Sequence, residues 1–258
     1  MKMEILFPGD SELARLMREL DWSATDPGPP DRWPEHWRTA VRLCLTSRIP
    51  VVMYLGANFT VLYNDSYISF LGETKHPRYL AHPAEECWRE IWPTIGPMLK
   101  GVFATGRATW SEDLLMFFAR RLPLEQVYVR FTFGPLMAPD GTVDGIFCPC
   151  TETTEQVVSA RRLDTLRRLA AKPLEARAVI AACRHATEVL DDNPYDVPFA
   201  GIYLCHEAGS RAVLAASTIG IRNTELLPVS VTATATPPWP LAAVLSSHAS
   251  AEVSNGSL

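Results

Sequence analysis

The sequence predicts an α+β fold for its central part, in which an antiparallel sheet carries helices on one face. From residue 51 to residue 151 the pattern indicates two strands, short helices, a long helix and then three strands in a meander. Within the fourth strand, Val127, Val129, Phe131 and Phe133 alternate with other residues and mark one inward face. Hydrophobic residues make up 47% of the 258 residues, which is enough for a core.

Composition excludes several classes of protein. The net charge is −5 and the isoelectric point is near 5.7, whereas a nucleic-acid-binding domain usually carries a basic surface. No apolar run reaches the roughly 18 residues of a membrane-spanning helix. Glu4 and Pro8 do not fit a signal peptide. We therefore expect a soluble, cytoplasmic protein with no membrane span and no nucleic-acid partner.

Residues 1–48 predict a helical cap at the N-terminus. Ser11 is placed to cap a helix over residues 12–20. Three prolines and a glycine within residues 26–30 then interrupt the chain. Pro34 suits the first turn of a second helix, which we expect over residues 34–47. The two helices form a leading cap rather than a domain of their own.

Residues 49–154 contain the predicted sheet. Gly56-Ala-Asn58 supplies a turn between the first two strands, and Asn64 can cap a short helix that Gly72 ends. A longer helical region over residues 84–105 is expected to break near Pro93 and again at Gly96-Pro97. The five strands are predicted at residues 51–55, 59–63, 109–118, 125–137 and 142–151.

Eight short segments of this region follow one another in an order and at a spacing that can be compared with known domains. They are Asp21-Trp-Ser-Ala24, Gly28-Pro-Pro with Trp33-Pro34, Leu62-Tyr-Asn-Asp65, Lys75-His-Pro77, Glu90-Ile-Trp92, Ala108-Thr-Trp-Ser-Glu-Asp-Leu114, Gly145-Ile-Phe-Cys148 and Thr151-Glu-Thr-Thr154. In their order and spacing, residues 22–170 resemble the PAS sensory domains of bacterial histidine kinases and related signalling proteins. The resemblance implies a five-stranded PAS sheet, a ligand pocket between sheet and helices, and output through the helix that follows.

The helix expected over residues 155–172 is a candidate signalling linker. Thr153 and Gln156 have the spacing of a capping box at its start. An apolar stripe follows, flanked by arginines: Val157, Ala160, Leu163, Leu166 and Ala170. The stripe fits either a short parallel dimer seam or a helix packed on its own domain with solvated arginines. Because the family commonly signals through dimers, we expect a homodimer, with Thr153, Thr154, Leu163 and Leu166 as relay residues.

Residues 173–258 predict a second, incomplete unit. An amphipathic helix over residues 174–190 precedes strands at 199–204 and 211–216. This resembles the opening of a GAF domain, another small-molecule-sensing fold. The 86 remaining residues fall short of the roughly 150 of one typical compact unit. We therefore expect a partial GAF-like α+β unit.

Aromatic and apolar side chains of the PAS-like region are candidates to line a ligand pocket. The nine candidates come from three strands and the helices between them: Met53, Tyr67, Leu71, Trp88, Ile91, Trp92, Phe131, Phe133 and Cys148. The alternative is that these side chains simply fill the core. Cys148 and Cys150 share one face of a strand, where packing is a simpler explanation than a redox or metal pair.

The sequence carries no motif that indicates an enzyme. Phosphate-binding, dinucleotide-binding, zinc-protease and serine-hydrolase signatures are absent, and the residues around His185 do not match a phospho-accepting histidine block. Glu112 and Asp113 are adjacent on a strand and are expected to face opposite ways. We predict no catalytic residue and no metal site in this chain; a longer parent protein would be a histidine kinase or a relative.

The cofactor is left unknown by the sequence. The Asn-Cys-Arg motif of covalent flavin light sensors is absent. His76 and His82 each lie close to a proline, and a capping or surface role is favoured over haem or metal ligation. The predicted function is a non-enzymatic sensory module that relays a small molecule or partner contact through the linker helix to an output domain outside the chain or a partner protein. The alternative is a ligand-free dimerisation or docking scaffold.

Overall fold

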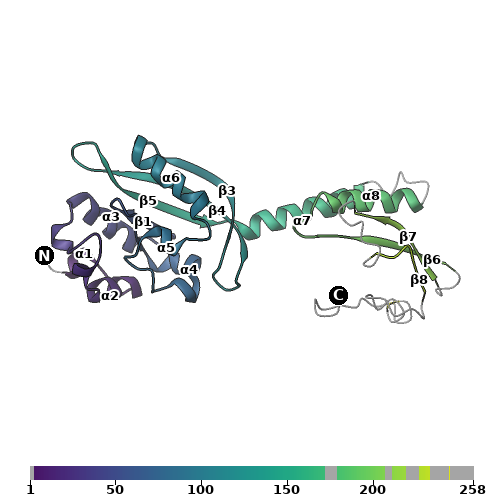
Figure 1. The fold of residues 1–258 in the computed structure, drawn as a ribbon, viewed down its shortest axis with the longest axis horizontal. Coiled ribbons are helices and arrows are strands. Elements are labelled where there is room, and N and C mark those ends of the chain that lie inside the picture. The colour runs from purple at the N-terminus through teal and green to yellow at the C-terminus, as the bar shows by residue number, and fades with distance from the viewer. Residues whose placement is uncertain (1–2, 172–178, 207–210, 219–226, 233–243, 245–258) are drawn as a thin grey trace. The chain divides into compact units, whose positions relative to one another are not determined.

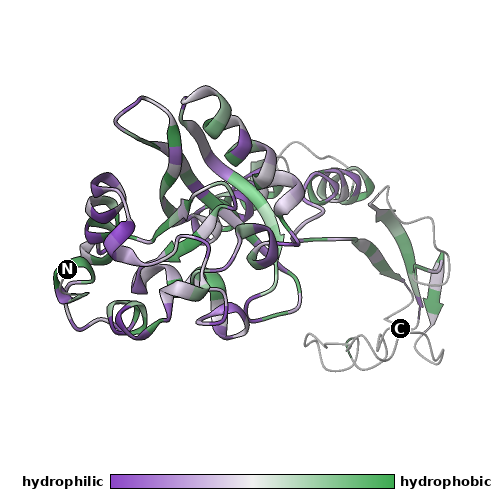
Figure 2. Cartoon of the chain, turned by 60° about the vertical axis from the view of Figure 1, so that its left-hand side comes forward, coloured by the Kyte–Doolittle hydropathy of each residue, from purple (hydrophilic) through white to green (hydrophobic). Residues whose placement is uncertain are grey.

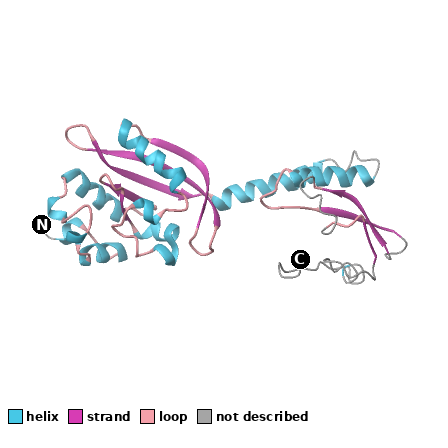
Figure 3. Cartoon of the chain, viewed as in Figure 1, coloured by secondary structure: helices cyan, strands magenta, loops and turns pink. Residues whose placement is uncertain are grey.

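The protein is described by a computed structural model that places residues 3–171, 179–206, 211–218, 227–232 and 244. Clustering of contacts divides the chain into two compact units, Met1–Val157 and Val158–Leu258. The first unit combines helices with a sheet, and the described part of the second has strands and helices as well (Figure 3).

The N-terminal cap packs into the first unit as part of one continuous core. Ser11 caps its second helix as predicted, because Ser11 Oγ accepts the Ala14 N–H at 3.3 Å. Asp65 from outside the cap accepts the N–H groups of Glu12 and Leu13 at 2.9 and 3.0 Å. Both hydrophilic and hydrophobic residues occur on the helices near the N-terminus (Figure 2). The elements of the cap are α1 (Met3–Leu6), α2 (Glu12–Glu19), η1 (Trp22–Ala24), η2 (Pro30–Arg32) and α3 (Glu35–Thr46).

Five antiparallel strands form the sheet of the first unit (Figure 1). They are β1 (Val51–Leu55), β2 (Thr60–Tyr63), β3 (Thr109–Phe118), β4 (Glu125–Met137) and β5 (Val143–Glu152). Their order is β2-β1-β5-β4-β3, with every neighbouring pair antiparallel. The predicted α+β class with a five-stranded antiparallel sheet is confirmed, and each strand lies within one residue of its predicted bounds.

The segment between β2 and β3 forms η3 (Asp65–Tyr67), α4 (Ile68–Lys75), α5 (Ala84–Cys87) and α6 (Trp92–Thr105). Asn64 caps this segment by accepting the Tyr67 N–H at 3.2 Å, as predicted. Gly72 interrupts α4 with φ +63°, and the chain resumes a helical path to Lys75. The predicted interruption near Pro93 is found at residues 88–91, between α5 and α6, whereas the predicted break at Gly96-Pro97 is wrong because α6 continues through it. Pro93 lies in the first turn of α6, where a missing N–H costs little.

A β-bulge corrects the prediction for Glu112 and Asp113. The register of β3 against β4 shifts between Ser111 and Leu114, so the strict alternation of side chains is lost there. Both carboxylates consequently approach the same guanidinium, with Arg130 Nη2 at 3.6 Å from Glu112 and 3.7 Å from Asp113. The two residues therefore do not face opposite ways.

The second unit contains most of α7 (Thr154–Ala171), then α8 (Val179–Asp191), β6 (Gly201–His206), β7 (Arg211–Ser217) and β8 (Ser230–Thr232). Its strands form a sheet in the order β6-β7-β8, of which the sequence had predicted β6 and β7. The GAF-like identity stays a prediction. The expected helix start at residues 174–178 and the stretch after Pro237 lie outside the described residues. No helix among the described residues is both long and apolar enough to span a membrane.

Candidate functional site

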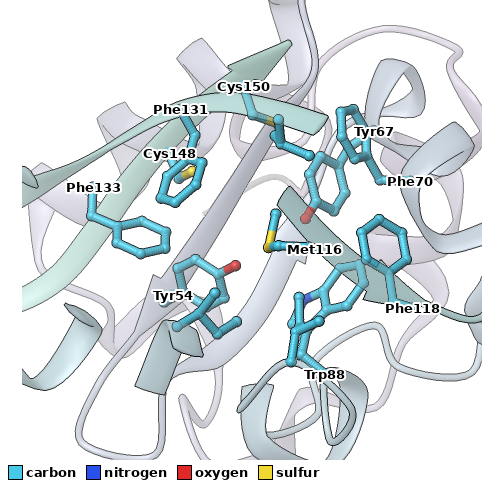
Figure 4. Close-up of a pocket in the computed structure, with 13 residues that line it drawn as sticks. Tyr54, Tyr67, Phe70, Trp88, Met116, Phe118, Phe131, Phe133, Cys148 and Cys150 are labelled. Carbon is cyan, nitrogen blue, oxygen red and sulfur yellow. The ribbon is translucent and has the colours of Figure 1, made fainter. Parts of the chain in front are cut away.

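A small apolar cavity lies between the sheet of the first unit and the helices that cover it (Figure 4). Its volume is about 40 Å³. Helical and loop residues form one wall, and side chains of β1, β3, β4 and β5 form the other. The lining residues are Tyr54, Tyr67, Phe70, Trp88, Ile91, Ile95, Met116, Phe118, Val129, Phe131, Phe133, Cys148 and Cys150.

Strand register determines which side chains reach the cavity. Tyr54 of β1 lies opposite Ile146 of β5, and Phe131 of β4 lies opposite Cys150. Since side chains alternate between faces, Tyr54, Cys148, Cys150 and Phe131 all point to the same side of the sheet. Residues 127–133 of β4 are buried at every second position, as the sequence pattern predicts.

The cavity gathers six of the nine predicted pocket residues: Tyr67, Trp88, Ile91, Phe131, Phe133 and Cys148. Met53 is fully buried but points to the opposite face of β1 from Tyr54. Leu71 is buried in α4 away from the lining, and Trp92 packs edge-on against Phe59 with ring centroids 6.1 Å apart. These three residues therefore do not line the cavity.

Sequence reasoning missed several lining residues that carried a usable signal. Val129 belongs to the inward-facing alternation of β4, and Cys150 shares a face with Cys148. Met116 lies opposite Val127 in the register, so its position follows once β3 and β4 are paired. Tyr54, Phe70, Ile95 and Phe118 needed the tertiary arrangement.

Burial keeps the polar groups of the cavity uncharged. The Tyr54 and Tyr67 hydroxyls converge on the space beside Met116 (Figure 4). Burial raises the pKa of Tyr54, Tyr67 and Cys148 well above their usual values. Trp88 is 1% exposed, and its Nε1 has no hydrogen-bond partner among the described residues. The cavity thus presents apolar walls, neutral hydroxyl and thiol groups and the unpaired indole N–H of Trp88.

A partly buried ion pair lies against two aromatic residues of the cavity wall. Lys75 Nζ lies 4.4 Å from the Trp88 ring centroid and 5.6 Å from that of Phe118. The ammonium forms an ion pair with Glu90, whose Oε1 also accepts the Ala119 N–H at 3.2 Å. Burial tends to raise the pKa of Glu90, but the Lys75 hydrogen bond, backbone N–H donors and the Lys75 charge together outweigh burial, and the pKa is lowered.

Arg120 connects the end of β3 with the end of β5. Its guanidinium binds Glu152 through two hydrogen bonds of 2.7 and 2.8 Å and Glu125 through one of 2.7 Å. The Arg120 side chain is only 7% exposed. Hydrogen bonding to Arg120 lowers the pKa of Glu152. Glu152, which Arg120 binds, lies two residues before the first residue of α7.

The first residues after β5 are attached to β4 through Tyr128. The Thr153 N–H donates to the Tyr128 carbonyl at 2.8 Å, and the Tyr128 N–H donates to Thr154 Oγ1 at 3.0 Å. The predicted capping box at Thr153 and Gln156 is wrong, because Thr153 Oγ1 is buried without a hydrogen-bond partner. The Thr153–Tyr128 hydrogen bond continues the β4–β5 pairing past Glu152, and the Thr153 side chain does not cap α7.

The remaining predicted relay residues lie farther along α7. Leu163 is 48% exposed and Leu166 is 63% exposed, so the apolar stripe is exposed to solvent at these two residues. The alternative with solvated arginines holds for Arg162 and Arg168, which are 65% and 44% exposed, but not for Arg161, which is 21% exposed. Arg161 and Arg162 both bind Asp196, at 2.6 and 3.0 Å, and Arg168 pairs with Asp192. A dimer seam stays a prediction.

The histidines considered as ligands have other partners. His76 is not a surface residue, because its side chain is 10% exposed and lies between the Tyr63 hydroxyl at 2.9 Å and Glu12 at 3.1 Å. His82 is half exposed, 3.8 Å from Glu86. No cluster of three metal-ligating side chains occurs among the described residues.

Comparison with protein-family models gave no match, and comparison with curated proteins gave none. Solved structures do resemble the chain. The LOV protein of Rhodobacter sphaeroides is 12% identical over 53% of this chain and 77% of its own, with a TM-score of 0.39. The PAS domain of Bordetella pertussis BvgS is 15% identical over 52% and 98%, with a TM-score of 0.37. A sensory box sensor histidine kinase of Vibrio cholerae is 12% identical over 46% and 91%, with a TM-score of 0.33.

Proposed function

We propose that the first unit is a non-enzymatic sensory module that responds to a small molecule in the cavity and passes the response to α7. A ligand acts in this way only if it binds one packing of the protein better than another. The two packings proposed here differ in how β3, β4 and β5 lie against the covering helices. Helix α7 then carries the difference toward the second unit or a partner protein.

The observation that carries the proposal is that the cavity walls and the attachments of α7 lie on the same strands. Phe118 lines the cavity and directly precedes Ala119 and Arg120, which bind Glu90 and Glu152. Val129 lines the cavity and directly follows Tyr128, which bonds to Thr154. A shift of these walls on ligand binding therefore has a short, hydrogen-bonded route to the start of α7.

Mass spectrometry of the purified protein under native and denaturing conditions tests for the ligand. Mass retained only under native conditions supports the sensing cavity. A clean unliganded dimer favours the scaffold alternative. The scaffold reading gains support from two features, the small volume of the cavity and the exposure of Leu163 and Leu166 on α7.

Hydrogen exchange tests the route to α7 without knowledge of the ligand. A Val129→Ile substitution adds one methylene group at the cavity wall and imitates partial occupancy. We expect it to change the exchange rates of amides in residues 154–171. Met53→Leu is the matched control, since Met53 is equally buried but points to the other face of β1. Equal exchange in α7 for wild type and both variants, with each variant folded, would reject the relay.

A further inference from the structure

The cavity restricts the chemistry of whatever occupies it, and this further step rests on the sensing function proposed above. We propose that its ligand is a neutral molecule of up to about four non-hydrogen atoms with a hydrogen-bond acceptor at one end, such as a short carbonyl compound. Three features lead to this class: the volume of the cavity, its lack of charge, and the indole N–H of Trp88.

Volume sets the size of the ligand. One water molecule needs roughly 10–15 Å³ by the same measure, so a cavity of about 40 Å³ holds about three water-sized spheres. Cofactor and drug-sized pockets usually measure about 300–1,000 Å³. The cavity as it stands therefore fits a molecule of a few atoms and does not fit a flavin or a haem.

The absence of charge from the lining requires a neutral ligand. None of the cavity-lining residues is an acid, a base or a histidine. The buried cation Lys75 contacts the rings of Trp88 and Phe118, is not among the lining residues and is already paired with Glu90. A charged ligand would lose its hydration without gaining a counter-ion. The raised pKa values of Tyr54 and Tyr67 reflect the same environment.

Trp88 sets the polarity of the ligand. Three other tryptophans of this unit use their indole N–H groups: Trp22 donates to Met17, Trp33 to Pro27 and Gly28, and Trp37 to Asp144. Trp88 Nε1 is equally buried and unpaired, and Figure 4 shows the nitrogen on the side of the ring nearer Tyr54. Buried donors are nearly always bonded, so an acceptor within the cavity would complete this one.

Two probes of the same shape test the assignment: acetone, which has an acceptor, and isobutene, which has none. Their affinities are measured by NMR titration of wild type and of Trp88→Phe, which removes the donor and keeps an aromatic ring. Comparing the two proteins cancels the different hydration of the two probes. We expect Trp88→Phe to weaken acetone binding about fivefold more than isobutene binding, the effect of one ordinary hydrogen bond. The Trp88 indole proton, identified by its loss in the variant, should shift with acetone, and that of Trp22 should not.

Each of the other possible results would reject one specific part of the proposal. Equal effects of Trp88→Phe on both probes, with both bound in the cavity, would reject the acceptor while leaving the sensing cavity in place. A larger or charged molecule found by native mass spectrometry would reject the ligand class and support the sensing function. Binding of neither probe by a folded protein would reject the ligand class as well. The sensing function is tested separately. It fails if the amide hydrogen exchange of α7 is the same in Val129→Ile as in wild type.

Discussion

The backbone N–H of Tyr128 donates to Thr154 Oγ1 at 3.0 Å, and this bond attaches the first residue of α7 to strand β4. Thr153 completes the attachment from the other direction, since its N–H donates to the Tyr128 carbonyl at 2.8 Å. The start of α7 therefore extends the β4–β5 pairing beyond Glu152. These bonds are the route by which we propose that a change in the position of β4 reaches the helix.

The two threonines should respond in opposite ways to the same substitution. Thr154→Val removes the acceptor of the Tyr128 N–H, and we expect a loss of about 1 kcal/mol in the free energy of unfolding. Thr153→Val replaces a buried hydroxyl that has no partner with a methyl group, and should be neutral or stabilising. Urea unfolding of the three proteins checks both values. Equal destabilisation by the two variants would contradict the hydrogen-bond assignment.

Glu152 should make stability depend on pH in the acid range. Its folded pKa is lowered by Arg120, so the paired carboxylate stabilises the fold above its unfolded pKa of roughly 4.3. This stabilisation is lost as the pH falls through the lower, folded value. We expect Glu152→Gln to cost about 2 kcal/mol at pH 7, and much less near pH 3.

Thermal unfolding from pH 7 to pH 3 measures this difference. Glu112→Gln is the control, because the Glu112 side chain is 70% exposed and lies 3.6 Å from Arg130. That variant should follow wild type at every pH. If the difference in stability between wild type and Glu152→Gln stays constant with pH, the result would argue against the ion pair between Glu152 and Arg120.

Two glycines in helices should respond oppositely to alanine. A Cβ on Gly72 would lie 2.7 Å from the Arg120 carbonyl oxygen, and φ is +63° there. Gly72→Ala should therefore destabilise by about 2 kcal/mol or more, since it combines backbone strain with a clash. Gly101 lies inside α6, and a Cβ added there would meet no atom within 4 Å, so Gly101→Ala should stabilise by about 0.5–1 kcal/mol. Calorimetric unfolding of both variants distinguishes these effects.

Thiol reactivity should separate Cys205 from the other cysteines. Cys205 is exposed, whereas Cys44, Cys87, Cys148, Cys150 and Cys183 are buried. Burial raises the pKa of Cys87 to about 12 and that of Cys148 well above its usual value, so little thiolate forms at pH 8. Iodoacetamide at pH 8 should modify Cys205 rapidly and the buried thiols only on unfolding. Peptide mapping checks the sites, and rapid labelling of Cys148 would favour a redox role for the Cys148–Cys150 pair.

Sequence patterns were sufficient for the five strands of the first sheet and for six of the thirteen residues that line the cavity. The alternation in β4 predicted the inward face, and the shared face of Cys148 and Cys150 followed from strand geometry. Local capping by Ser11 and Asn64 was also predictable, because each cap depends on residues three positions apart. Helix breaks were less predictable, since a proline such as Pro93 is tolerated in a first turn.

The sequence alone determined the fold class, because strand and helix periodicities are local properties of the chain. Tertiary structure decided which residues meet across long separations. Arg120 can bind Glu152 only when β3, β4 and β5 pair. Met53 lies away from the cavity because the face of β1 that lines the cavity carries Tyr54, and Met53 is on the opposite face. Likewise Thr153 loses its role as N-cap because the β4–β5 pairing continues to Tyr128. Such contacts depend on register and packing between distant segments, which no local pattern encodes.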